Sequence, residues 1–393
     1  MAGPPWTILN YAFRPFFLMN GLFAMAVMMV WIMVLHGIDL VPLPANTMLW
    51  HGHEMIVGFA GAAIAGFMLT AVATWTGRPP VHGPLLGWLV FAWLAGRLAM
   101  ALAGSLPSML VAAIDLSFPV LLCGIASREV IAGRNRRNLP IALITALFAV
   151  LNLLYHLGAD RMALYLLIHL VLVLITVIGG RIIPNFTANW LNARGQIDLP
   201  VSGGPIDPVA ILCTIAVGIA ASLSDTGWVT GLLAFAAALA HAIRLARWRG
   251  LATTSEPMLF VLHVTYLWLP VGYALMGLAA FGAIFTPTAA LHALTMGGVA
   301  GMVLAVTTRV ALAHTGRALH AARLTVIAYG VFMLAAVIRT LSPLSGTAYL
   351  GMIDLAAAGW IIAFGLFTWV YWPVLTGPRA DGKPERPVPD STR

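Results

Sequence analysis

Apolar runs of about twenty residues recur along the whole chain, separated by short segments that hold most of the charged residues. A helix of ~20 apolar residues is long enough to cross the ~30 Å hydrocarbon core of a bilayer. The pattern therefore predicts an all-α polytopic membrane protein with about twelve transmembrane helices. Their expected ranges are about 16–36, 53–75, 83–104, 107–130, 139–158, 161–183, 207–224, 227–248, 256–279, 287–312, 319–341 and 349–373.

All twelve helices fall in one predicted transmembrane domain, residues 1–373. Residues 374–393 are rich in proline and charge, which is typical of a disordered tail. The longest connection, about 184–206, contains several Gly, Pro and Asn residues and divides six helices from six. That division is common in secondary transporters, so a transporter is one of the classes to consider.

Composition agrees with a membrane protein. Of the 393 residues, 61% are hydrophobic and only 9% are charged, whereas a soluble domain has about 25% charged residues. The net charge of +8 comes from basic loops that face anionic lipid, so membrane lipid is an expected partner and nucleic acid is not.

Arginine is distributed unevenly between the two sides of the predicted bundle. Short basic loops stay on the cytoplasmic side of a membrane, whereas the opposite loops hold little beyond Asp39, Asp160, Arg161 and Asp225. Both termini are therefore expected in the cytoplasm. The arginines on the cytoplasmic side of this scheme are Arg14, Arg78, Arg128, Arg134, Arg136, Arg137, Arg194, Arg244, Arg247, Arg249, Arg317 and Arg323.

The stretch WHGHE, residues 50–54, places two histidines and a glutamate at the external end of the second helix. Residues two apart point about 200° apart around a helix. His51 and His53 are therefore poorly placed to hold one metal ion together and would serve two neighbouring centres. Glu54 is the candidate catalytic residue, because it can orient an imidazole or pass protons. The alternative is that the stretch caps the helix and meets lipid headgroups.

A weak internal repeat relates this region to a later one. HEMIVGFAGAAIAGFMLTAVATWTGR (53–78) aligns without a gap with HALTMGGVAGMVLAVTTRVALAHTGR (292–317). The alignment pairs His53 with His292 and Gly58 with Gly297, and its offset fits units of four helices, with the helix of His169 as a third equivalent. Two imidazoles on pseudo-equivalent helices can bind one haem iron from both sides. We therefore expect His53 and His292 to bind a shared haem.

Charged residues inside membrane helices are functional candidates. Arg97 and Arg339 lie towards the external side, where they would bind haem propionates or, alternatively, pair with Asp115 and Asp354.

Histidines elsewhere in the helices extend the set of candidates. His263 is as well suited to a metal as to a structural hydrogen bond, whereas His241 is expected to be structural. The candidate metal ligands are His51, His53, His169, His263, His292 and His314. The histidines near helix ends are expected to be interfacial, namely His36, His82, His156 and His320.

Six motifs together resemble the NnrS family: FRPFFL (13–18), WHGHEM (50–55), GFMLTAVATWTGR (66–78), GGRIIPNFT (179–187), HALTMGG (292–298) and RVALAHTGR (309–317). The resemblance runs from about residue 10 to 372. It implies a bacterial inner-membrane protein that contains haem and copper and is associated with denitrification and nitric oxide stress. The residues that it points to are Arg14, His51, His53, Glu54, Arg181, His292, Arg309 and His314.

The leading functional hypothesis is a protein with haem b and copper that binds nitric oxide and reduces or detoxifies it. The chain has no CxxCH motif and no nucleotide-binding fingerprint, so electrons would come from an external donor such as quinol or a cytochrome. By analogy, haem–copper oxidases and nitric oxide reductases share the twelve helices, but their paired histidines and HPEVY-type motif are missing here. The alternatives are a transporter of copper, haem or a small anion, and a nitric oxide buffer without turnover.

Overall fold

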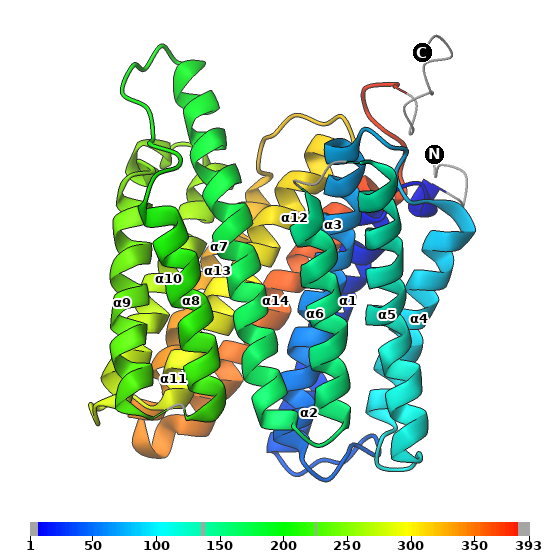
Figure 1. Ribbon diagram of the computed structural model, residues 1–393, viewed down its shortest axis with the longest axis vertical. Coiled ribbons are helices and arrows are strands. Elements are labelled where there is room, and N and C mark those ends of the chain that lie inside the picture. Colours follow the sequence, from blue (N-terminus) through cyan, green and yellow to red (C-terminus); the bar gives the residue numbers. More distant parts are fainter. Residues whose placement is uncertain (1–6, 135–137, 225, 384–393) are drawn as a thin grey trace. The chain divides into compact units, whose positions relative to one another are not determined.

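The computed structural model describes residues 7–134, 138–224 and 226–383. These residues form helices and connecting segments, with no strand among them. Twelve of the helices are long and apolar enough to cross a membrane, which confirms the predicted fold class (Figure 1). Arg136, Arg137 and Asp225, which entered the predicted charge distribution, lie outside the described residues.

Two of the twelve spans contain a π-helical segment. In chain order the helices are α1 (Phe13–Leu35), α2 (Thr47–His53), η2 (Glu54–Ala60), α3 (Gly61–Thr76), α4 (Gly83–Ala101), α5 (Ser108–Ala132), α6 (Leu139–His156), α7 (Asp160–Asn192), α8 (Ile206–Leu223), α9 (Trp228–Ala246), α10 (Pro257–Ala280), α11 (Pro287–His292), η5 (Ala293–Ala300), α12 (Gly301–His314), α13 (Arg323–Leu341) and α14 (Tyr349–Thr376). The segments η2 and η5 are π-helical, and short 3₁₀ turns occur elsewhere, including η4 (Gly250–Thr253).

The chain forms two compact units, each with its own interior. Of the described residues, one unit comprises 7–134, 138–164, 307–319 and 364–383, and the other comprises 165–224, 226–306 and 320–363. The expectation of one domain over residues 1–373 stays a prediction.

In the first unit α1 packs on α3, α4 packs on α5, and α5 packs on α6; these helices lie side by side in Figure 1. The π-helix η2 is buried among them. A π-turn is wider than an α-turn and shifts the backbone hydrogen bonds, and two side chains bond carbonyls within this segment. Asn20 donates to the Phe59 carbonyl at 2.7 Å, and the Trp93 indole donates to the Gly58 carbonyl at 3.0 Å. These bonds help to hold the π-segment in place.

In the second unit α9 packs on α8 and α10, and α10 also packs on α11 and η5. A polar side chain is buried where α9 ends, because Arg244 in the last turn of α9 is almost fully buried. Its guanidinium donates to Asp207, to the Thr176 carbonyl and to the Tyr266 hydroxyl. Gly180 of α7 leaves room for it, since a Cβ at Gly180 would lie 1.7 Å from a guanidinium nitrogen.

The predicted repeat is visible in the backbone. Each π-segment begins directly after the aligned histidine, at Glu54 and at Ala293. An aromatic ring of the preceding long helix packs closely against each of the aligned glycines, Gly58 and Gly297. The motif IDL also recurs, at 114–116 and 353–355, with the same offset of 239 residues that separates the two histidines. The role of α7 as a third equivalent stays a prediction.

Two boundaries differ clearly from expectation. The helix expected at 161–183 continues to Asn192 as α7, so its Pro184 lies inside a helix. The second span begins at Thr47, which places WHGHE within the span instead of at its end.

The last helix ends at Thr376, and the residues after it contact the end of α12. Arg379 donates to the His314 carbonyl at 2.8 Å, and the Ala380 amide donates to the Thr315 carbonyl at 2.9 Å. Arg379 also hydrogen-bonds Asp381, which lowers the pKa of that carboxyl group to about 2. Residues 384–393 of the expected tail lie outside the described residues.

Candidate metal centre

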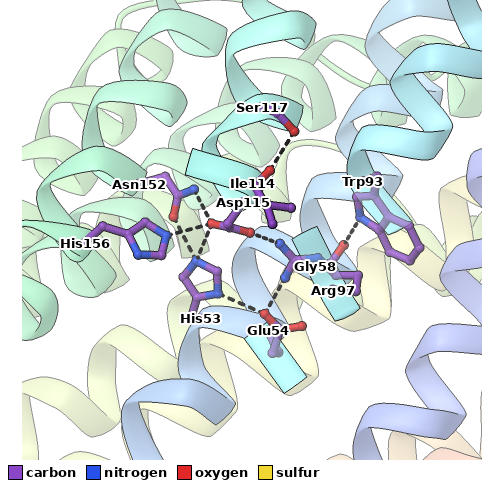
Figure 2. Close-up of polar contacts among 10 residues, drawn as sticks. All are labelled: His53, Glu54, Gly58, Trp93, Arg97, Ile114, Asp115, Ser117, Asn152 and His156. Atoms are coloured by element: carbon purple, nitrogen blue, oxygen red, sulfur yellow. Dashed lines mark hydrogen bonds and ion pairs between the residues drawn. The ribbon is translucent and has the colours of Figure 1, made fainter. Parts of the chain in front are cut away.

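A buried polar cluster lies among four membrane spans of the first unit (Figure 2). It is built from His53 at the end of α2, Glu54 at the start of η2, Arg97 of α4, Asp115 of α5, and two residues of α6. The α6 residues are Asn152 and His156, which lie four positions apart and therefore on one face of the helix. His53, Glu54, Asp115 and Asn152 have at most 1% of their surface exposed.

His53 has acceptors at both ring nitrogens. Its Nδ1 lies 2.9 Å from a carboxylate oxygen of Glu54, and its Nε2 lies 2.8 Å from the amide oxygen of Asn152. The same Nε2 is 3.2 Å from Oδ2 of Asp115. The ring of Tyr155 covers His53 with a centroid separation of 4.5 Å. Glu54 thus orients the imidazole, which is one of the two roles expected for it.

Asp115 is the hub of the cluster. Its Oδ2 accepts a hydrogen bond from Asn152 Nδ2 at 2.7 Å and lies 2.9 Å from His156 Nε2. Its other oxygen, Oδ1, accepts from Arg97. Gly96 permits this approach, because a Cβ there would lie 3.1 Å from Asp115 Oδ1. Each oxygen of the buried carboxylate therefore has a polar partner, as burial of a charge requires.

Arg97 holds the two carboxylates together. One terminal nitrogen donates to Glu54 and the other to Asp115, so a single cation lies between two anions. Of the two partners expected for Arg97, a haem propionate and Asp115, the structure shows Asp115.

Three side chains of the cluster have the composition and spacing of a metal site. One ring nitrogen each of His53 and His156 and one oxygen of Asp115 lie within 4.8 Å of one another, the one such group among the described residues. Imidazole nitrogen with carboxylate oxygen is a donor set that suits first-row divalent metals, including Cu(II). Glu54 and Asn152 supply the outer hydrogen bonds that such ligands usually have. The residues present therefore fit copper.

The surroundings of His53 bear on both metals. A copper ion and a haem iron would each need one of its ring nitrogens, and the hydrogen bond to Glu54 or to Asn152 would have to break in either case. His53 also has no exposed surface. A shared haem between His53 and His292 stays a prediction.

The remaining candidates of the first unit lie outside the cluster. His51 stacks on Trp31 with ring centroids 4.3 Å apart, so His51 and His53 have separate surroundings, as the helix geometry predicted. The His314 ring contacts the rings of Tyr11 and Phe13.

Four predicted site residues belong to the second unit. The Nδ1 atoms of His169 and His292 hydrogen-bond the carbonyls of Tyr165 and Thr288, each at 2.8 Å. His263 is 2.9 Å from the Thr187 hydroxyl. The fourth, Arg339, donates to Ser342. Their metal and haem roles stay predictions.

Sequence reasoning missed Asn152 and His156. His156 was expected to be interfacial because it ends a helix, but it contacts Asp115 inside the unit. A signal was present: Asn152 and His156 are polar residues one turn apart on a largely apolar helix. Their partners are 37 to 99 positions away, so no local pattern identifies them.

Comparison with known proteins identifies the family of the chain. No curated protein sequence matches the chain. The family model of the NnrS protein matches residues 7–379, nearly the whole chain. The match includes every residue of the cluster and both π-segments. The chain therefore belongs to the NnrS family.

Proposed function

We propose that this protein handles nitric oxide in the bacterial inner membrane and that it uses a copper ion held by His53, Asp115 and His156. One observation carries the assignment of the copper site: two imidazoles and a carboxylate lie within 4.8 Å of one another inside a buried unit. Membership of the NnrS family supports the link to a nitric oxide response.

Copper bound there would supply a one-electron redox centre that can bind nitric oxide. The chain's own residues would prepare the site. Glu54 fixes the His53 ring through Nδ1, which leaves Nε2 facing Asp115. Asn152 orients Asp115 through Oδ2. Arg97 balances the carboxylate charge, and Tyr155 helps to exclude water by covering the imidazole.

We propose haem b as the second cofactor, with His292 as the candidate ligand. Its Nδ1 bonds the Thr288 carbonyl, which is the usual way in which a protein orients a ligating imidazole. Reduction of nitric oxide would require electrons from an external donor, quinol or a cytochrome. Measurement of nitrous oxide during anaerobic turnover would separate reduction from binding alone.

The copper site is tested by metal analysis of protein purified in detergent. We expect about one copper per chain in the parent and a loss of most of it in His156→Ala, because that variant removes one ligand at the rim of the cluster. His320→Ala is the matched control, since His320 is exposed in a loop. Normal copper content in folded His156→Ala would refute the site.

Haem content of the same preparations separates the two interpretations of His53. If His53 is a copper ligand, His53→Ala should keep haem and lose copper, whereas His292→Ala should lose haem. A shared haem predicts that both variants lose low-spin haem and that the double variant is little worse than either single variant, as for residues that act as one unit.

A further inference from the structure

Tyr266 and His241 form a buried phenol–imidazole pair in the second unit. The Tyr266 hydroxyl lies 2.8 Å from His241 Nδ1, and both residues have 0% exposed surface. Neither belongs to the candidate metal centre. A buried phenol bonded to an imidazole is chemically special, because loss of an electron from the phenol makes its proton strongly acidic and the imidazole can accept it.

The neighbouring hydrogen bonds fix the direction of this pair. Thr214 donates its hydroxyl proton to the Ala210 carbonyl at 2.8 Å, so its oxygen accepts from His241 Nε2 at 3.0 Å. A neutral imidazole that donates at Nε2 accepts at Nδ1. Tyr266 therefore donates its proton to His241, and its oxygen accepts from Arg244 at 2.9 Å.

The cation beside this bond is itself paired with a carboxylate. Arg244 is close enough to oppose a second positive charge on His241, but its Nε donates to the carboxylate of Asp207. That ion pair compensates the arginine. A proton that moves from Tyr266 to His241 would therefore not meet an unbalanced cation.

Other oxidisable rings adjoin the pair. The Trp248 ring lies 4.5 Å from the Tyr266 ring, and the Tyr273 ring stacks on His241 at 5.6 Å with an interplanar angle of 14°. Trp248 and Tyr273 are as buried as Tyr266. Electrons can pass between rings at such separations, so an oxidising equivalent that reaches this group has a path to Tyr266.

We propose that Tyr266 is a redox-active tyrosine with His241 as its proton acceptor. In the reaction a one-electron oxidant takes an electron from Tyr266, the O–H bond breaks, and a new N–H bond forms at His241 Nδ1. The products are a neutral tyrosyl radical, an imidazolium and the reduced oxidant. The expected class of oxidant is a small radical that enters the membrane, such as nitrogen dioxide, which becomes nitrite. This inference does not depend on the copper site.

The test uses purified full-length protein and a photogenerated ruthenium(III) polypyridyl complex as oxidant. Samples frozen after the flash are examined by electron paramagnetic resonance. We expect a tyrosyl signal in the parent, loss of at least nine-tenths of it in Tyr266→Phe, and retention of it in Tyr273→Phe. Tyr273 is the matched control because it is buried on the same helix and contacts the same imidazole.

Two further measurements keep the test independent of folding. Protein grown with ring-deuterated tyrosine should give a narrowed signal, whereas ring-deuterated tryptophan should leave it unchanged. His241→Gln should lower the radical yield several-fold, because the strong proton acceptor is gone. An equal signal in Tyr266→Phe, a signal that responds only to labelled tryptophan, or an unchanged yield in His241→Gln would overturn the proposal.

Discussion

At the scale of single residues, the candidate centre depends on partners that are distant in the sequence. WHGHE and its polar character were visible, and Arg97 with Asp115 was one of two expected pairings. The structure adds Asn152 and His156 from α6. Sequence patterns report which face of a helix is buried, but they do not report which buried faces meet. The ligand set could therefore be predicted only in part.

Arg97 provides the residue-scale test of the ion cluster. Arg97→Leu leaves Glu54 and Asp115 as buried carboxylates without their shared cation, and breaking a buried pair in this way costs about 3–5 kcal/mol. We expect that loss in the free energy of unfolding, measured by denaturant titration in detergent. The double variant Arg97→Leu with Asp115→Leu should recover part of it. Unchanged stability of Arg97→Leu would show that the pairing contributes nothing.

At the scale of elements, apolar runs predicted the helices within a few residues, except where backbone chemistry departs from the α-helix. Pro184 lacks an amide proton, and the polar residues after it resemble a loop, so the extension of α7 was missed. The two π-segments were also missed. A π-turn holds about one residue more than an α-turn, and this difference does not change the hydropathy of the apolar run. The repeat aligned the histidines that precede both segments, but it did not predict their π-helical turns.

Substitution of the glycines in the π-segments tests how closely these segments are packed. A Cβ at Gly58 would lie 2.6 Å from the Phe23 ring, and one at Gly297 would lie 2.2 Å from the Trp268 ring. We expect Gly58→Ala and Gly297→Ala each to lower the free energy of unfolding by about 1–3 kcal/mol through overpacking. Gly124→Ala is the control, because its Cβ would meet nothing within 4 Å. Equal behaviour of all three variants would contradict close packing at the π-segments.

At the scale of the whole molecule, hydropathy gave the number of spans and arginine gave an expected orientation. The division into two units could not be predicted, since it depends on which helices pack together. Arg14 illustrates the difference between a charge counted from the sequence and the partners that the residue has in the fold. It was counted as a cytoplasmic charge, yet it is fully buried and donates to the carbonyls of Leu375 and Gly377, each at 2.8 Å. The start of α1 and the end of α14 therefore lie on the same side of the first unit.

Reporter fusions test the orientation. A reporter inserted after Arg247 should report the cytoplasm, and one inserted in the segment 342–348 should report the external side, because basic loops are retained inside. Alkaline phosphatase and green fluorescent protein fusions at both sites measure this. External activity after Arg247 would reverse the arrangement and place WHGHE at the cytoplasmic side.

The contact of Arg14 also has a consequence for biosynthesis. Its carbonyl partners are about 360 positions later in the chain, so the ribosome makes the arginine near the beginning and the acceptors near the very end. During nearly the whole of translation the guanidinium lacks these two acceptors, because both are made near the end of the chain. The contact that joins the start of α1 to the end of α14 can therefore form only after the last helix has been made, which makes it a late step in completing the first unit.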